Sequence, residues 1–274
     1  MRSGYFLARE QNLTTFAVHK LKNHYLCAVE TEKRMFTFRQ FTIEQDRCAM
    51  KVGTDGVLLG AWAELPIVSG VGSPTPRVLD IGTGTGVVAL MMAQRYPDAL
   101  VDAVEIDVDA AFQAGENVTR SPFVSRVRVF NTSIQDFAAA STERYDAIVS
   151  NPPYFQNSLR NPDEQRSLAR HADSLPFSEL IRAAAVLLKD DGVMSIIIPT
   201  GNTLNDIVEQ AVYQGFLVAR QTFVKTSERR VPKRCLLELA RRRDAEPVIE
   251  TQCLSGIGNT RSEWYANITK DFYL

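Results

Sequence analysis

The chain has 274 residues, the length of one large domain or of a domain with an appendage. Its 31 basic and 32 acidic residues leave a net charge of -1, and 45% of its residues are hydrophobic, which excludes collagen-like and disordered chains. No apolar run approaches the ~18 residues of a membrane-spanning helix. The near-neutral charge also disfavours a protein that coats nucleic acid by bulk charge, while leaving room for a local basic patch.

The four cysteines lie far apart without a Cys-x-x-Cys pair, and the three histidines form no His-Glu-x-x-His motif. We therefore predict no metal site and no disulfide framework, and a reducing, cytoplasmic location fits best. Residues 1–34 have neither a secretory pattern nor clear periodicity. We interpret them as an added leader or an over-long start, and residues 35–274 as a single domain.

From Arg77 onward, short apolar runs alternate with amphipathic stretches, which predicts a parallel sheet covered by helices. The expected strands are 77–81, 100–106, 127–131, 145–150, 193–199, 216–224 and 234–240. The expected helices begin after the glycines at 82–86 and then span 107–117, 178–188 and 204–213. No helix separates the last two strands, so the last should be antiparallel. The irregular stretches 151–176 and 226–233 are candidates for the site, since loops at the carboxyl edge of such sheets usually build it.

A glycine-rich turn joins the first expected strand to the first helix. Its spaced residues are Asp80, Gly82, Gly84 and Gly86. Glycines there permit a tight turn and let a ligand approach the backbone. A dinucleotide fingerprint would need a further glycine where Val87 or Ala89 stands, so a nicotinamide cofactor fits less well. The spacing instead resembles the first motif of S-adenosylmethionine-dependent methyltransferases, with a plain strand-to-helix turn as the alternative.

Three acidic residues follow the next strands at positions where a nucleoside could bind. Glu105 ends the second strand, where a carboxylate accepts hydrogen bonds from both ribose hydroxyls. Asp107 is either a further cofactor contact or the N-cap of the next helix. Asp136 follows the third strand. At this position the S-adenosylmethionine-dependent methyltransferases, which the glycine turn resembles, place a side chain against the adenine of the cofactor. The alternative for Asp136 is a solvated loop aspartate.

The tetrapeptide Asn151, Pro152, Pro153 and Tyr154 directly follows the fourth strand. The prolines fix the backbone, so the Asn151 amide oxygen and the Pro152 carbonyl can act as rigid acceptors for a planar NH2 group, with Tyr154 stacked on the base. The nitrogen can lose its proton after the methyl group arrives, so positioning and electrostatics would supply most of the rate. For the tetrapeptide alone, a proline-rich turn with an Asn cap is the alternative.

Together these motifs resemble the bacterial tRNA (adenine-N6)-methyltransferases that modify adenine 37 of tRNA1(Val). The resemblance rests on segments 36–41, 50–62, the glycine motif, 151–155 and 271–274. It implies an α/β fold with a seven-stranded Rossmann-like methyltransferase sheet, helices on both faces and an antiparallel last strand. It also implies S-adenosyl-L-methionine as cofactor and the tRNA anticodon loop as partner, its adenine unstacked beside Tyr154.

The resemblance assigns roles to two further groups of residues. Lys51, Thr54 and Asp55 would lie over the cofactor, with Thr54 and Asp55 facing its methionine end. The alternative is a helix start with Thr54 as N-cap, and both roles are compatible. A second, basic group would lie near the substrate, with a solvated helical face as the alternative. Its members are Arg166, Arg170 and His171.

Positive charge is concentrated late in the chain, where residues 220–244 hold nine basic and three acidic residues. Such a patch would bind phosphates and position tRNA, so affinity would fall with salt. Its candidate RNA-binding residues are Arg229, Arg230, Lys233 and Arg234. The alternative is that residues 241–243 only form a solvated strand end.

The sequence favours one reaction and leaves two alternatives open. In the favoured one, Asn151 orients the adenine N6 amine, Pro152 accepts its second hydrogen and Tyr154 stacks on the ring. A glutamine N5-methyltransferase of a translation protein uses the same tetrapeptide, but it would need a separate helical N-terminal domain. A catalytically silent module that binds RNA or cofactor would not need an intact tetrapeptide.

Overall fold

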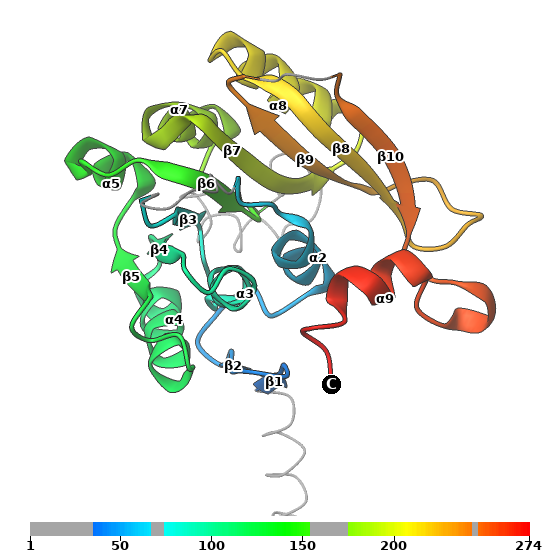
Figure 1. The fold of residues 1–274 in the computed structure, drawn as a ribbon, viewed down its shortest axis with the longest axis horizontal. Coiled ribbons are helices and arrows are strands. Elements are labelled where there is room, and N and C mark those ends of the chain that lie inside the picture. Colours follow the sequence, from blue (N-terminus) through cyan, green and yellow to red (C-terminus); the bar gives the residue numbers. More distant parts are fainter. Residues whose placement is uncertain (1–34, 67–73, 154–174, 243–245) are drawn as a thin grey trace, which may run out of the picture.

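The computed structural model describes residues 35–66, 74–153, 175–242 and 246–274, and its centre is an eight-stranded mixed sheet (Figure 1). The strands lie side by side in the order β10-β8-β9-β7-β6-β3-β4-β5. In chain order they are β3 (Arg77–Ile81), β4 (Leu100–Glu105), β5 (Val127–Asn131), β6 (Tyr145–Ser150), β7 (Leu188–Pro199), β8 (Leu217–Lys225), β9 (Arg234–Ala240) and β10 (Val248–Cys253). All seven expected strands are therefore present.

The expected antiparallel strand is confirmed, since β9 runs antiparallel to both of its neighbours, β7 and β8. The eighth strand, β10, was not predicted and lies at the edge of the sheet, parallel to β8. Its six residues are exposed or half-buried, and its sequence lacks the continuous apolar run that marks the inner strands. Apart from β9, the strands run in one direction, and their carboxyl ends lie along one edge of the sheet.

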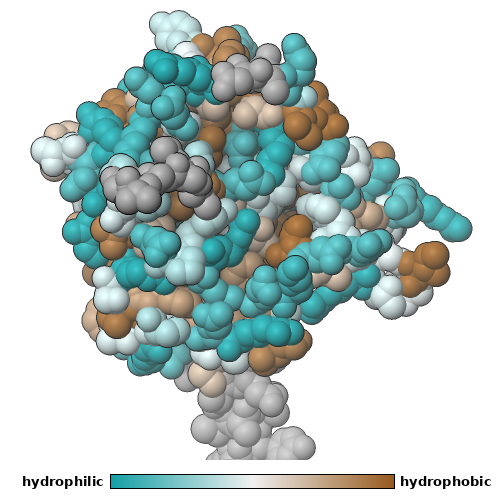
Figure 2. Space-filling model, viewed as in Figure 1, coloured by the Kyte–Doolittle hydropathy of each residue, from teal (hydrophilic) through white to brown (hydrophobic). Residues whose placement is uncertain are grey.

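Helices cover both faces of the sheet, and each face buries its own hydrophobic cluster. One face carries α2 (Thr54–Trp62), α3 (Val87–Arg95), α4 (Val108–Arg120) and α9 (Glu263–Thr269). The other carries α5 (Ile134–Ala140), α7 (Phe177–Leu187) and α8 (Asn202–Tyr213). Figure 2 shows mainly hydrophilic residues on the viewed surface, with hydrophobic ones in scattered groups, as expected when most apolar side chains are inside. Within the described residues, no helix has the length and apolar character needed to span a bilayer.

Two local features differ from the expectations, and a third decides between two open interpretations. A helix, α5, lies between the third and fourth strands of the sequence, where none was predicted. Ser133 is its N-cap, because the Ser133 hydroxyl accepts a hydrogen bond from the Asp136 amide at 3.0 Å. The N-cap of α2 is Gly53 rather than Thr54, which already has helical geometry. For Asp107 the capping interpretation holds, since its carboxylate accepts from the Ala110 amide at 2.8 Å.

A short hairpin of β1 (Met35–Thr37) and β2 (Thr42–Glu44) precedes the sheet. Its aromatic residues pack against the end of the chain, and the Phe38 and Tyr273 rings stack with centroids 6.2 Å apart. The Arg39 amide donates to the Phe272 carbonyl at 2.8 Å, and its guanidinium donates to the Tyr273 carbonyl. The sequence did not predict this hairpin because strands of three residues are too short to show a period.

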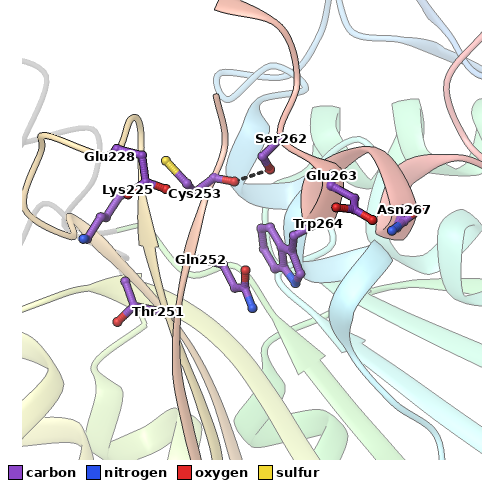
Figure 3. Close-up of a pocket in the computed structure, with 9 residues that line it drawn as sticks. All are labelled: Lys225, Glu228, Thr251, Gln252, Cys253, Ser262, Glu263, Trp264 and Asn267. Atoms are coloured by element: carbon purple, nitrogen blue, oxygen red, sulfur yellow. Dashed lines mark hydrogen bonds between the residues drawn. The ribbon is translucent and has the colours of Figure 1, made fainter. Parts of the chain in front are cut away.

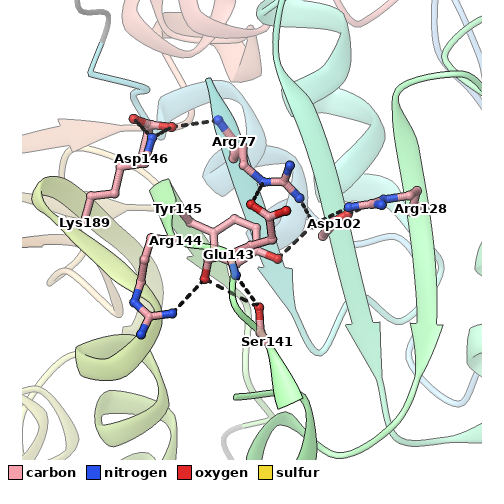
Figure 4. Close-up of polar contacts among 9 residues, drawn as sticks. All are labelled: Arg77, Asp102, Arg128, Ser141, Glu143, Arg144, Tyr145, Asp146 and Lys189. Carbon is pink, nitrogen blue, oxygen red and sulfur yellow. Dashed lines mark hydrogen bonds and ion pairs between the residues drawn. The ribbon is translucent and has the colours of Figure 1, made fainter. Parts of the chain in front are cut away.

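At the amino edge of the sheet, a polar cluster is organised around the Asp102 carboxylate, which is 2% exposed (Figure 4). It accepts hydrogen bonds from Arg77 at 2.9 Å and from Arg128 at 2.8 and 3.0 Å. It also accepts one from the Tyr145 hydroxyl at 2.8 Å, and burial raises the pKa of that phenol. These residues belong to β3, β4, β5 and β6, so one carboxylate joins four strands.

Candidate active site at the carboxyl edge of the sheet

The glycine-rich turn between β3 and α3 has the backbone that its glycines predict. Gly82, Gly84 and Gly86 have φ angles of 71°, 55° and 83°, in the left-handed region that favours glycine. A Cβ atom added to Gly82 or Gly84 would meet no atom within 4 Å, whereas one on Gly86 would lie 3.5 Å from the Ala114 Cβ. The first two glycines therefore leave an open surface for a ligand, whereas at Gly86 the left-handed φ, and not the space beside α4, favours glycine.

Asp80 lies beneath this turn and is buried. Its carboxylate accepts hydrogen bonds from the Thr83 hydroxyl at 2.6 Å and the Ala89 amide at 3.1 Å. Burial is the main cause that raises the pKa of Asp80, to about 7. These two bonds hold the turn and the start of α3 in place, and a role of Asp80 in binding the cofactor stays a prediction.

Glu105 ends β4 beside the turn, and its side chain is 9% exposed. One carboxylate oxygen accepts from the Gly84 amide at 2.9 Å, and the other accepts from the Asp107 amide at 3.0 Å. Each carboxylate oxygen has two acceptor positions, so Glu105 can hold the backbone and still accept hydroxyl hydrogens from a ligand. The ribose role of Glu105 stays a prediction, with which this geometry is compatible.

The segment Asn151–Pro153 lies at the same edge as the glycine turn. The preceding residue, Ser150, is paired in register with Ile81 at the end of β3, and its hydroxyl donates to the Ile81 carbonyl at 2.8 Å. Pro152 is buried, while Asn151 and Pro153 are half-buried. The structure therefore brings the two predicted motifs together, with Gly82 and Asn151 following neighbouring strands.

Helix α2 covers Asn151. A Cβ atom added to Gly56 would lie 3.7 Å from the Asn151 Nδ2 atom and 3.4 Å from Val87 at the start of α3. Helix α2 therefore packs next to both motifs at Gly56, where a Cβ would make ordinary van der Waals contacts. Lys51 and Thr54 precede Gly56 and are exposed, so the predicted cofactor segment 51–55 ends next to Asn151.

An ion pair joins α2 to the start of β9, where the connection from β8 ends. The Asp55 carboxylate accepts from the Arg234 Nε atom at 2.7 Å, and both side chains are half-buried. The same connection is held to the end of β7, because the Thr200 hydroxyl donates to the Pro232 carbonyl at 2.9 Å. Asp55, which was predicted to bind the cofactor, therefore contacts Arg234, which was predicted to bind RNA. This contact lies at the carboxyl edge of the sheet, which also holds the glycine turn and Asn151.

Comparison with known proteins defines the family. Residues 69–225 match the model of the methyltransferase small domain. The chain is 48% identical to a protein of Bacteroides thetaiotaomicron and 42% identical to one of Parabacteroides distasonis, in both cases over 87% of this chain and 97% of the relative. A relative from Citrobacter koseri is 40% identical over 87% of this chain and 94% of its own length. Each bears the name tRNA1(Val) (adenine(37)-N6)-methyltransferase.

The chain belongs to this methyltransferase family. Solved structures confirm the fold. A protein described as a predicted O-methyltransferase from Agrobacterium tumefaciens superposes with a TM-score of 0.59 at 16% identity, over 80% of this chain and 96% of its own. A type I restriction-modification methyltransferase subunit from Streptococcus thermophilus gives 0.55 at 16% identity, over 81% of this chain and 52% of its own.

The basic segment of the methyltransferase does not form one surface, contrary to the simple charge count. The Arg220 guanidinium bonds Glu64 and Glu238 at 2.6 and 3.0 Å and lies 3.8 Å from the centre of the Trp62 ring. Arg241 packs over Phe216, 5.4 Å from its ring centre. The exposed Arg242 lies at the amino edge near two aspartates, which agrees with a solvated strand end. Arg229, Arg230 and Lys233 remain exposed together in the β8–β9 connection.

The other predicted residues are Asp136, which follows the carboxyl end of β5, and those that lie outside the described chain. Asp136 lies in the first turn of α5, exposed, where its carboxylate accepts from the Ser133 hydroxyl at 2.7 Å. The remaining candidates fall outside the described residues: Tyr154, Arg166, Arg170 and His171. Among the residues that the structure does describe, no group of three or more metal-ligating side chains comes together.

Apart from Lys51, the sequence did not predict a wall formed by residues 45–52, between β2 and α2. The Asn117 amide nitrogen on α4 donates to the carbonyls of Glu44 and Thr85 at 2.9 Å each, so it ties the end of β2, directly before this wall, to the glycine turn. Burial raises the pKa of the Cys48 thiol to about 12, with smaller contributions from the nearby Glu105 and Asp107 carboxylates. Buried polar residues at 113 and 117, four apart on α4, were the signal that could have revealed this contact.

Replacement of Glu105 by alanine should raise the Kd for S-adenosylmethionine by about 100-fold, because hydrogen bonds to a charged group contribute about 1.5–3 kcal/mol each. Both the ribose contacts and the anchor of the Gly84 amide would be lost. Isothermal titration calorimetry measures this Kd, and Glu209→Ala on the exposed face of α8 is the matched control. Unchanged affinity in Glu105→Ala would disprove the ribose role.

Proposed function

We propose that this protein transfers the methyl group of S-adenosylmethionine to N6 of adenine 37, on the 3′ side of the anticodon, in tRNA1(Val). The observation that carries the proposal is the position of Asn151–Pro153 directly beside the open glycine turn and Glu105. Relatives 40–48% identical are named for this reaction. A methyl donor and a planar amine would thus meet at one edge of the sheet.

The residues of this edge fit the cofactor. S-adenosylmethionine, when bound, supplies an electrophilic methyl group. The open backbone at Gly82 and Gly84 can accept its methionine portion, and the Glu105 carboxylate can accept the ribose hydroxyls. Lys51, Thr54 and Asp55 lie on the segment that closes over this position, while Asp107 holds the start of α4 beside it.

Asn151 and Pro152 provide the acceptors for the substrate. The lone pair of an exocyclic amine is delocalised into the ring, so the amine is a poor nucleophile until its hydrogens are held. The Asn151 Oδ1 atom and the Pro152 carbonyl accept the two hydrogens, which lets the lone pair turn towards the methyl group. Pro153 fixes the backbone, and Tyr154 stacks on the adenine. The nitrogen releases its proton after the methyl group has arrived, so positioning supplies most of the rate.

Basic residues near this edge position the RNA. Arg229, Arg230 and Lys233 are exposed in the β8–β9 connection, which contacts the end of β7. Arg234 reaches α2 through Asp55, and Arg166, Arg170 and His171 add to the RNA contact from the segment after Tyr154. Unstacking adenine 37 costs less in a loop than in a duplex. Because tRNA modification requires access to tRNA, we also propose a cytoplasmic location.

The decisive experiment is methyl transfer from isotope-labelled S-adenosylmethionine to unmodified tRNA, with nuclease mapping of the product. We expect N6-methyladenosine at position 37 of tRNA1(Val). Label in a release factor or ribosomal protein, with none in any tRNA, would retain the chemistry but move the substrate to protein. An absence of label in both would indicate a binding module.

A further inference from the structure

A hollow of about 440 Å³ opens at the carboxyl end of β10, next to α9 (Figure 3). One wall carries Lys225, Thr251 and Gln252, and the other carries Glu263, Trp264 and Asn267. The two walls are joined where the Ser262 hydroxyl donates to the Cys253 carbonyl. Its volume lies within the range of small-molecule sites, roughly 300–1,000 Å³.

This hollow lies on the same edge of the sheet as Asn151. β8 and β10 are parallel to β6, so Lys225 and Cys253 lie at the carboxyl ends of their strands, as Ser150 does. Four strand spacings separate β6 from β10, which corresponds to about 19 Å. α9 also packs against α2, the helix that covers Asn151. One large substrate can therefore reach both places at once.

The side chains of the hollow match the chemistry of a nucleobase. Trp264 is half-buried and lies beside Gln252, whose amide nitrogen is held by the Glu250 carboxylate at 2.9 Å. An aromatic face next to amides suits a base, because every base combines a stacking face with an edge of donors and acceptors. The carboxylates of Glu228 and Glu263 disfavour a free polyanion but can accept from base amino groups.

Phosphate contacts are available next to this base site. Lys225 lines the hollow, and the β8–β9 connection that follows it carries the exposed Arg229 and Arg230. Such contacts position an RNA backbone without reading its sequence. The hollow therefore combines a stacking face, a polar edge and adjacent cations, which are the parts of a site for an unstacked nucleotide.

We propose that this hollow binds an unstacked base of the tRNA substrate, at a nucleotide other than the methylated adenine. The inference rests on the proposed function, since it takes tRNA as the substrate, and it adds a second contact by which the enzyme recognises that RNA. Trp264 stacks on the base, Gln252 and Asn267 contact its edge, and Lys225 contacts the adjoining phosphate.

Tryptophan fluorescence tests the stacking directly. The chain has two tryptophans, and Trp62 is 5% exposed in the core, so unmodified tRNA transcript should quench the emission of Trp264. Trp264→Phe should abolish this quenching while keeping the tRNA affinity within about threefold, since phenylalanine still stacks. Trp264→Ala should weaken tRNA binding by about 10-fold or more, with the Kd for S-adenosylmethionine unchanged.

Salt dependence separates the charged contact from the stacking contact. Lys225→Gln should lower the slope of log affinity against log salt by roughly 0.7–0.9, whereas Trp264→Ala should leave that slope unchanged. Tyr213→Ala is the matched aromatic control, because Tyr213 is 88% exposed at the end of α8 on the amino edge. Its tRNA affinity should equal that of the wild type.

Trp264 also packs against the core, so thermal unfolding of Trp264→Ala is measured alongside binding. If that variant is unfolded, two other measurements test the base site: the quenching experiment and the tRNA affinity of Asn267→Ala. Asn267 is exposed, and its replacement should weaken tRNA binding by about threefold or more. The base site alone would be overturned if the wild-type protein methylates tRNA but its fluorescence is not quenched, and the folded variants bind tRNA with unchanged affinity. A wild-type protein that binds no tRNA would overturn the proposed function and this site together.

Discussion

Asn151→Ala is expected to lower kcat for tRNA methylation by about 1,000-fold, the loss that follows removal of one preorganised polar contact at a reacting group. The variant loses the side-chain acceptor that holds the adenine amine, while the Pro152 carbonyl remains. Affinity for S-adenosylmethionine should stay within a few-fold of the wild type, because Glu105 and the glycine turn are unchanged. Single-turnover kinetics with saturating tRNA measures the chemical step.

The matched control is Asn202→Ala, which changes an exposed asparagine at the start of α8. It should retain wild-type kcat and cofactor affinity. If calorimetry shows that Asn151→Ala weakens cofactor binding as much as it slows turnover, Asn151 holds the cofactor rather than the amine. That result would reassign the residue without changing the fold.

The largest expected effect on stability is that of Asp102→Ala at the amino edge, about 3–5 kcal/mol in the free energy of unfolding. Removing this carboxylate leaves the Arg77 guanidinium and the Tyr145 hydroxyl largely buried without their common acceptor. Urea denaturation followed by circular dichroism measures the change. Asp190→Ala, an exposed aspartate on the same edge, should change it by less than about 0.5 kcal/mol.

Asp102→Asn provides a further check on the role of charge. Asparagine preserves the shape of the side chain but removes its charge, so its destabilisation should fall between wild type and Asp102→Ala. If Asp102→Ala loses less than 1 kcal/mol, the cluster does not hold the strands together. Stability would then come from the two hydrophobic clusters alone.

The sheet was predictable because its inner strands are buried on both faces and appear as continuous apolar runs. The carboxyl-edge site followed from the same reasoning, since parallel strands place Gly82 and Asn151 after neighbouring strands. β10 and the β1–β2 hairpin were not predictable in this way, because the first is largely exposed and the second has very short strands. The capping serine at 133 was the available signal for α5.

The basic segment shows why charge counted along a chain differs from charge on a surface. β9 carries Arg241 and Arg242 across the sheet to the amino edge, away from the connection that holds Arg229. Arg220 is neutralised by Glu64, which is 156 residues earlier in the sequence. Neither the position of Arg242 nor the pairing of Arg220 with Glu64 can be inferred without knowing how the strands are arranged in the sheet.

The contact between Arg39 and the carbonyls of Phe272 and Tyr273 has a consequence for biosynthesis. The β1–β2 hairpin leaves the ribosome early, yet the partner of Arg39 at Tyr273 lies 234 residues later in the sequence. Contacts between residues so distant in sequence form late, because chain entropy opposes their closure. The wall of residues 45–52 follows this hairpin, so the cofactor side of the enzyme is completed only after residues 272–273 have been translated.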